Sequence, residues 1–144
     1  MDFTFTPPAP LVFGKSPEYY EARVADPFRR NLLTMETLRG KVDFGGDSRS
    51  LKMIFVDGQA TEFEIMMFEK GDTFLGLQLP MRATKFQNEL KKQNIRTKKE
   101  GGAVVLSDHN VRFYIFEGEI ATIRWGTDEP VPPTADQTEE AGKA

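Results

Sequence analysis

Two stretches of the chain, sixty positions apart, repeat the same order of side-chain types. Residues 51–64 read LKMIFVDGQATEFE, and residues 111–124 read VRFYIFEGEIATIR. In both, apolar and polar residues alternate on each side of an acid–glycine pair, which is typical of a β-hairpin with one buried face. The repeat therefore predicts two similar antiparallel units within one chain.

The turn at each acid–glycine pair decides which side chains share a face. A two-residue loop at Asp57 and Gly58 would place Glu62 and Glu64 in the core, where unpaired carboxylates are costly. One more loop residue, with Gly58 left-handed as a bulge after a type I turn, keeps both carboxylates out of the core. The second hairpin favours the same choice. The core face of the two hairpins is then predicted to carry Leu51, Met53, Phe55, Thr61, Phe63, Ile65, Met67, Val111, Phe113, Ile115, Ala121, Ile123 and Trp125.

Helix signals stand before each hairpin. Ser16 can cap a helix that begins at Pro17, and Asp26 with Pro27 repeats that signal for a second short helix or turn. Apolar spacing predicts another helix over residues 82–93. Strands are expected at residues 34–44, 51–56, 60–68, 96–99, 103–107, 111–116 and 120–125. The predicted class is α+β, with two similar helix-plus-antiparallel-meander halves at about residues 12–69 and 74–125 in one domain, 1–125.

Length and composition narrow the class of protein. A chain of 144 residues with 39% hydrophobic and 28% charged residues is typical of one globular domain. The absence of cysteine excludes disulfides and suits a reducing compartment, and no leader peptide or apolar span is recognisable, so a cytoplasmic location without a membrane is expected. Residues 126–144 are rich in acid and proline and poor in apolar residues, which predicts a disordered acidic tail.

The sequence contains no recognisable set of catalytic residues. His109 is the sole histidine, and it follows Ser107 and Asp108 in a predicted turn, where sequence neighbours cannot aim at one another as a catalytic triad must. One histidine without cysteine offers no transition-metal set, and no phosphate-loop spacing is present. The expectation is a protein that is not an enzyme and that holds no cofactor or metal.

The second face of the predicted hairpins mixes charge with apolar and aromatic side chains. It is expected to carry Lys52, Ile54, Val56, Glu62, Glu64, Met66 and Phe68 in the first hairpin and Arg112, Tyr114, Phe116, Ile120, Thr122 and Arg124 in the second. Such a face is either covered by the N-terminal arm and helices or offered to a partner. Burial is the simpler of the two interpretations.

A basic run stands between the two predicted meanders. Residues 82–99 hold seven basic side chains and one acid, and the densest part is Lys91, Lys92, Arg96, Lys98 and Lys99. This run could hold phosphates or an acidic protein. A pI of about 5.3 and the lack of interleaved aromatic residues disfavour nucleic acid. Lysines that guard a sheet edge are the structural alternative.

The repeated unit resembles a known fold. An apolar pair with glycine precedes a proline-started helix, and a meander ends in VRFYIFEGEIATIRW. This order resembles the helix-plus-sheet unit of the beta-lactamase-inhibitory-protein-like fold, which small outer-membrane assembly lipoproteins and some bacterial immunity proteins share. The inhibitor itself is a tandem of two such units. This chain lacks a lipid-bearing cysteine and the inhibitor's disulfides, so a lipoprotein role is disfavoured.

The resemblance implies a small protein-binding protein, most specifically an immunity protein that sterically occludes a co-produced antibacterial toxin. The expected contact residues are Ile54, Arg112, Tyr114, Phe116 and Arg124, because aromatic and arginine side chains anchor such interfaces. Two alternatives stay open: an adaptor or chaperone for a secreted or phage component, and a nucleic-acid-binding protein that uses the basic run of residues 91–99.

Overall fold

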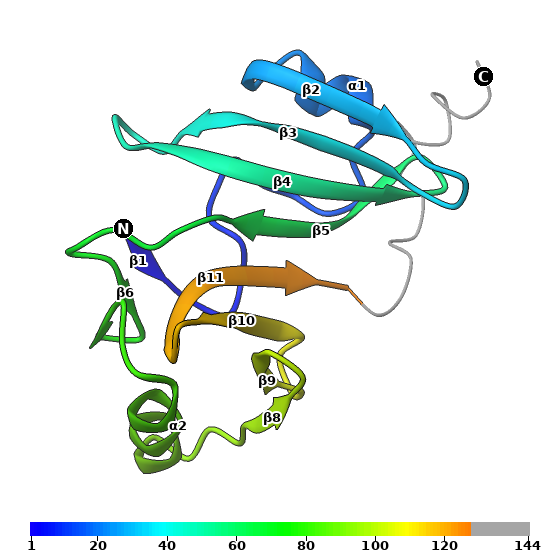
Figure 1. Ribbon diagram of the computed structural model, residues 1–144. Helices are drawn as coiled ribbons and strands as arrows, with labels where there is room; N and C mark the ends of the chain where they lie inside the picture. The colour runs from blue at the N-terminus through cyan, green and yellow to red at the C-terminus, as the bar shows by residue number, and fades with distance from the viewer. Residues whose placement is uncertain (128–144) are drawn as a thin grey trace.

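The computed structural model describes residues 1–127, so the predicted acidic tail lies outside the described residues except for Gly126 and Thr127. Figure 1 shows the arrangement of the elements. The elements are β1 (Asp2–Phe3), α1 (Pro17–Glu21), β2 (Ala25–Asn31), β3 (Glu36–Asp43), β4 (Ser48–Val56), β5 (Gln59–Ile65), β6 (Thr73–Phe74), β7 (Leu77–Gln78), α2 (Ala83–Lys92), β8 (Lys98–Glu100), β9 (Ala103–Leu106), β10 (Val111–Phe116) and β11 (Glu119–Gly126).

The described strands form two sheets. Eight antiparallel strands lie in the order β2-β3-β4-β5-β11-β10-β9-β8, and β1, β6 and β7 form a small separate sheet. The centre of the large sheet is the pairing of β5 with β11, in which Ile65 lies opposite Ile123 and Phe63 lies opposite Trp125. This non-local pairing joins the two hairpins, β4–β5 and β10–β11, into one continuous surface.

The predicted α+β class of two helix-plus-meander halves is wrong, because the chain is mostly β. The helices span only five and ten residues, and the strands of the two predicted meanders merge into one eight-stranded sheet. The short helix or turn expected from Pro27 is instead the edge strand β2, which pairs irregularly with β3 between Ala25 and Phe28. Asp26 takes a φ of 50°, and an edge strand tolerates Pro27 because the missing N–H removes no ladder bond.

The hairpin turns differ from the predicted type, yet the core faces are largely as predicted. Asp57 and Gly58 both have positive φ, 52° and 75°, which defines a two-residue type I′ turn. A bulge then restores the side-chain alternation: Met53 pairs with Phe63, whereas Phe55 pairs with Ala60. The second hairpin shows the same shift in register between Tyr114 and Ile115.

This bulge changes two of the predicted core positions. Ala60 and Ile120 are fully buried, whereas Thr61 and Ala121, which were expected in the core, are only half-buried. The remaining predicted core residues of the two hairpins are buried except for Met67, which is exposed, and Ile115, which is half-buried.

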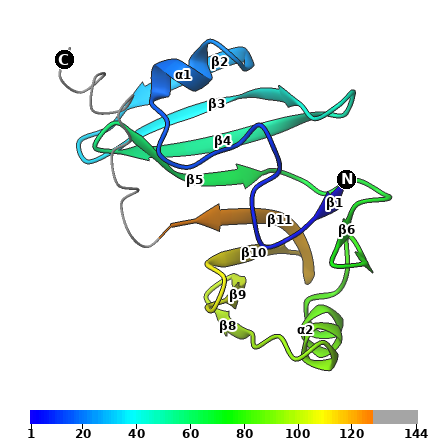
Figure 2. The same cartoon turned by 180° about the vertical axis from the view of Figure 1, so that it is seen from behind.

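The N-terminal arm, residues 1–16, and both helices cover one face of the large sheet. Figures 1 and 2, which view the molecule from opposite sides, show the arm crossing behind β4 and β5 in the first view and in front of them in the second. The Tyr20 ring of α1 lies 5.6 Å from Phe63, and Phe86 of α2 lies 4.7 Å from Phe113. The Tyr20 hydroxyl donates to the Val12 carbonyl and accepts from the Val12 N–H, both at 2.7 Å, and burial raises the pKa of Tyr20 to about 12.

A buried ion pair ties β4 to the loop before β6. Arg49 and Asp72 are 3% and 1% exposed, and the guanidinium donates two hydrogen bonds to the carboxylate, at 2.8 and 2.6 Å. Asp72 also accepts hydrogen bonds from the Glu69 N–H and the Met1 amino group. Burial alone would raise the pKa of Asp72, but Arg49 and these donors outweigh it and lower the pKa to about 2.

Replacing Asp72 by Asn is expected to destabilise the fold by roughly 3 kcal/mol at pH 7, because Arg49 would lose its buried carboxylate and keep only the more exposed Asp47 and Glu69 as charged partners. In the wild type, the contribution of the Asp72 charge is full above its unfolded pKa near 4 and is lost as pH falls towards about 2. Urea unfolding of both proteins from pH 7 downwards measures the difference in their free energies of unfolding. This difference should become smaller over the pH range in which the Asp72 carboxylate is protonated. Glu69→Gln is the matched control, since this exposed carboxylate reaches Arg49 at 3.4 Å and its loss should change stability little. If Asp72→Asn is as stable as the wild type at pH 7, or if it loses no more stability than Glu69→Gln, the buried pair of Arg49 and Asp72 does not stabilise the fold as proposed.

Candidate interaction face

The face of the large sheet opposite the core carries the candidate site. The arm and both helices pack on the other side, so this face, turned towards the viewer in Figure 1, presents side chains of the large sheet. The site residues predicted from the sequence sit here. Ile54, Arg112, Tyr114 and Arg124 are half-buried among their neighbours on this face, and Phe116 is 63% exposed where β10 ends. We call this surface the open face.

Cross-strand register lines up one row of side chains across the entire sheet. Each residue of the row lies directly opposite the next: Phe28, Arg39, Lys52, Glu64, Arg124, Arg112, Val105 and Lys98. Five of these eight residues are cationic and one is a carboxylate. Directly opposed residues have side chains about 5 Å apart at Cβ and so interact strongly with one another. We call this set the cationic row.

The centre of the open face is a compact charged cluster. Arg124 pairs with Glu62, which lies one row away on β5. The Nε atom of Arg124 is buried and has no hydrogen-bond partner among the described residues. A small cavity of about 50 Å³ lies here, lined by Lys52, Ile54, Glu62, Glu64, Tyr114 and Arg124. Arg124 thus anchors the cluster from the strand that joins the two halves of the sheet.

The two carboxylates of this cluster stand in different surroundings. Burial raises the pKa of Glu64, and the nearby charges of Lys52 and Arg124 offset only part of that effect. For Arg124, burial would lower the pKa, but the hydrogen bond and charge of Glu62 outweigh it and raise the pKa. Glu62 is therefore the specific partner of Arg124, whereas Glu64 is a carboxylate whose charge is poorly compensated by its surroundings.

Sequence reasoning missed Arg39 and misplaced Phe68 and Ile120, both of which were expected on the mixed face and lie in the core. Arg39 joins the cationic row through the pairing of β3 with β4, a register that alternation alone does not reveal. Phe68 was expected on the mixed face, but it follows the end of β5 and packs in the core, with its ring 5.6 Å from Phe3. Lys52, Glu62 and Glu64 were placed on the correct face without being singled out. The alternation around Leu38 and Val42, both buried, is the signal that could have placed Arg39.

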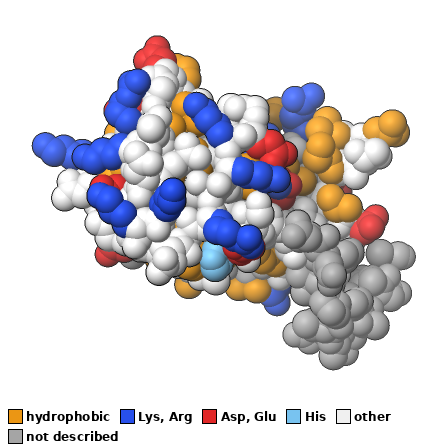
Figure 3. All heavy atoms as spheres, turned by 90° about the horizontal axis from the view of Figure 1, so that it is seen from below, with side chains coloured by type: hydrophobic (Ala, Val, Ile, Leu, Met, Phe, Trp, Pro, Cys, Tyr) orange, Lys and Arg blue, Asp and Glu red, His pale blue; other side chains and the backbone are white. Residues whose placement is uncertain are grey.

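The basic run is divided among separate surfaces. Lys91 and Lys92 lie at the end of α2, and Arg96 lies in the turn that follows. Lys98 pairs with Val105 on the open face, whereas Lys99 is opposite Val104, whose side chain is in the core, so these two lysines point to opposite sides of β8. Figure 3 views the molecule from the side on which α2 and β8 lie in Figure 1, and it shows Lys and Arg side chains with acidic side chains among them.

Several cations of the run already have partners. Lys92 pairs with Glu89 at 3.2 Å, and Lys98 pairs with Glu100 at 3.1 Å. Arg96 makes a two-pronged contact with Asp108 at 2.8 to 3.1 Å. The run therefore does not form the single cationic surface that a nucleic-acid backbone needs.

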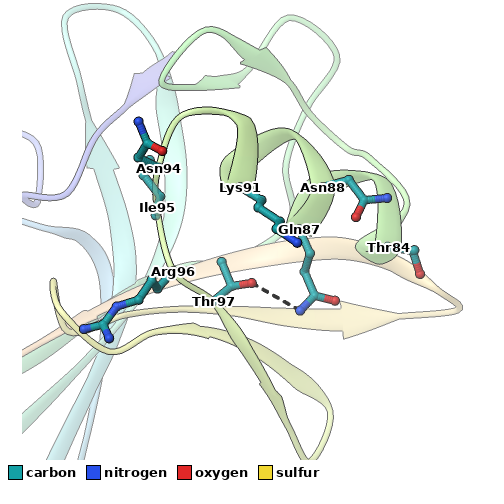
Figure 4. A pocket seen from close by; sticks show the side chains of 8 residues that line it. All are labelled: Thr84, Gln87, Asn88, Lys91, Asn94, Ile95, Arg96 and Thr97. Carbon is teal, nitrogen blue, oxygen red and sulfur yellow. Dashed lines mark hydrogen bonds between the residues drawn. The ribbon is translucent and has the colours of Figure 1, made fainter.

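A polar groove lies between α2 and residues 94–97 (Figure 4). Its volume is about 640 Å³, and Gln87 donates a 3.3 Å hydrogen bond to Thr97 across it. The groove is lined by Thr84, Gln87, Asn88, Lys91, Asn94, Ile95, Arg96 and Thr97. These side chains include no nucleophile with an adjacent base, so the groove has no constellation for acid–base or covalent chemistry.

His109 lies in the turn between β9 and β10, as expected for a turn residue, and its ring stacks on Phe5 at 3.6 Å. Within residues 1–127, no group of three histidine, cysteine, aspartate or glutamate side chains is placed to hold a metal ion. No helix of the described chain has the length and apolar character needed to cross a membrane.

Comparisons of the chain with protein-family models, with curated proteins and with solved structures find no match. The geometry of the open face and the sequence resemblance therefore carry the proposals below.

Exchanging each carboxylate of the cluster for its amide should separate their roles. Glu64→Gln is expected to leave stability unchanged or raise it by up to about 1 kcal/mol at pH 7, because it removes a charge that burial disfavours. Glu62→Gln, two positions away on the same strand, should lower stability by about 1 kcal/mol, because Arg124 loses its ionic acceptor. Urea unfolding at pH 7 measures both. Equal losses for the two variants would show that the cluster acts as one unit and that this distinction is mistaken.

Proposed function

We propose that this chain is a non-catalytic protein-binding protein that uses the open face of its large sheet. The observation that carries the proposal is that Ile54 and Tyr114 lie beside Arg124, with Phe116 at the end of β10, on a face opposite all of the described covering elements. Phe116 is 63% exposed, and aromatic side chains next to arginine are the residue types that anchor protein interfaces.

In its most specific form, the proposal is an immunity protein that binds a co-produced antibacterial toxin and blocks access to the toxin's active site. This form rests on the resemblance of the repeated unit to that of immunity proteins and inhibitors. A broad, continuous face suits steric occlusion, because a standard interface needs roughly 800 Å² on each partner. The mechanism requires no reaction by this chain, only a slow dissociation rate.

An adaptor or chaperone role is the second candidate, and one observation favours it. Leu33 is fully exposed at the turn between β2 and β3, and Leu32, Met35 and Val56 are also exposed close to this end of the sheet. Hydrophobic side chains gather at this end of the molecule in Figure 3. An apolar tip of this kind suits weak contacts with extended client segments.

Capture experiments with two matched double variants test the proposal. The tagged protein, expressed in the organism that makes it, should retain one stoichiometric partner at moderate salt. Tyr114→Ala with Phe116→Ala should weaken that partner's affinity at least about a hundredfold, the loss expected for two central anchors. Leu33→Ala with Met35→Ala, which removes apolar surface away from the open face, should leave it within about threefold.

Calorimetry with the purified partner gives the affinities, and thermal melts confirm that all proteins are folded. If the partner is also toxic when produced alone, the immunity form is supported. Many weak clients that are lost only from the Leu33 and Met35 variant would replace the proposal with the adaptor role. An open-face variant that is folded and binds with unchanged affinity would overturn the use of this face.

A further inference from the structure

The cationic row contains two cross-strand pairs of like charge. Arg39 lies directly opposite Lys52, and Arg112 lies directly opposite Arg124. Like charges in directly opposed positions destabilise a sheet, so each pair costs stability in the free protein. The same unfavourable contact occurs in the β3–β4 pairing and in the β10–β11 pairing. An anionic group that binds from outside the row would relieve the repulsion in both.

Internal carboxylates compensate only part of the row. Glu62 pairs with Arg124, Glu100 pairs with Lys98, and Glu64 lies directly opposite both Lys52 and Arg124. Among the ion pairs formed within residues 1–127, none involves Arg39, Lys52 or Arg112. Arg39 is exposed and the other two are half-buried. Arg39 and Arg112 have no carboxylate directly opposite, and Lys52 faces Glu64 without a closed ion pair, so an external anion can bind all three.

We propose that the open face recognises an acidic segment of a partner protein, whose carboxylates bind across Arg39, Lys52 and Arg112. This inference rests on the proposed protein-binding function and names the chemistry of the partner. Guanidinium groups bind carboxylates through two parallel hydrogen bonds, which gives the contact orientation as well as charge. Ile54 and Tyr114 lie beside the row and can pack against the apolar parts of the same segment.

The dimensions of the row fit an extended peptide. Arg39 on β3 and Arg112 on β10 are separated by four strand spacings, a distance of about 19 Å at about 4.8 Å per strand. An extended segment of roughly six residues covers that distance. A nucleic-acid backbone is the less favoured polyanion, because the apolar side chains of Val105 in the row and Ile54 beside it suit the side chains of a peptide and not a phosphate backbone.

Fluorescence anisotropy tests the inference with the full-length protein at low salt. The probe is a labelled peptide of roughly twelve alternating glutamate and serine residues, long enough to cross the row, and the glutamine–serine peptide and an oligothymidine of similar length are its controls. The row variant combines Arg39→Gln, Lys52→Gln and Arg112→Gln. The matched control removes the same charge from α2 by Lys85→Gln, Lys91→Gln and Lys92→Gln, all of which are exposed.

The row variant should lose about tenfold in affinity for the acidic peptide, and the α2 variant no more than about threefold. The row variant should also unfold at a higher temperature than the wild type, because it removes both like-charge pairs. This second readout shows that the variant is folded. Equal losses in the two variants would overturn the inference, as would tighter binding of oligothymidine than of the acidic peptide.

Two further outcomes identify other occupants or separate the two proposals. Residues 128–144 contain five carboxylates, Asp128, Glu129, Asp136, Glu139 and Glu140. If their replacement by amides in the full chain raises affinity for the acidic peptide about tenfold, the chain's own C-terminal segment is the occupant and the inference falls. If the captured partner is lost from the Tyr114 and Phe116 variant but binds the row variant normally, protein binding by the open face stands and the acidic chemistry is wrong.

Discussion

The pairing of β5 with β11 is the interaction on which the rest of the structure depends. It places Ile65 against Ile123 and Phe63 against Trp125 on the core face, and Glu64 against Arg124 on the open face. The seam between the hairpins is thus apolar on its core face, and burial of these four side chains favours this register over one shifted by a residue. Without this pairing the chain would have two small sheets, and no row of side chains could cross from β3 to β10.

The distribution of covering elements follows from that single sheet. The apolar side chains of all its central strands point to one side, so the arm and both helices gain by packing there. The Tyr20 hydroxyl holds the arm at Val12, and the buried pair of Arg49 with Asp72 fixes the loop beyond β5. The arm and this loop are therefore both held on the core face of the sheet. The opposite face is left to its own charge pairs, and this is why it is the candidate surface for a partner.

Local patterns in the sequence predict the parts of this fold that depend on near neighbours. The core faces of both hairpins, the Ser16 cap and the extent of α2 follow from alternation, capping chemistry and apolar spacing. The turn type does not, because a type I′ turn with a later bulge gives the same core face beyond the bulge as the turn that was predicted. Asp26 and Pro27 also mislead, since an aspartate–proline pair suits a helix start and an edge-strand bulge equally.

The class and the site depend on contacts that are distant in the sequence. The α+β prediction is wrong because nothing in either hairpin shows that β5 pairs with β11. The cationic row could not be predicted for the same reason. Arg112 and Arg124 were selected as contact residues, whereas Arg39 joins the row only through the register of β3 on β4. Alternation within each hairpin predicted the face of Ile54 and of Tyr114, but only the pairing of β5 with β11 brings the two side chains to one cavity.

Nuclear Overhauser contacts across the β5–β11 seam test whether the two hairpins form one continuous sheet. We expect cross-strand backbone contacts between Ile65 and Ile123 and between Phe63 and Trp125. Amide protons at the seam should be among the slowest to exchange, because the middle of the sheet opens only when the whole domain unfolds. Absence of these contacts while those within each hairpin persist would contradict the continuous sheet. The molecule would then contain two separate sheets, and neither a continuous open face nor a cationic row would exist.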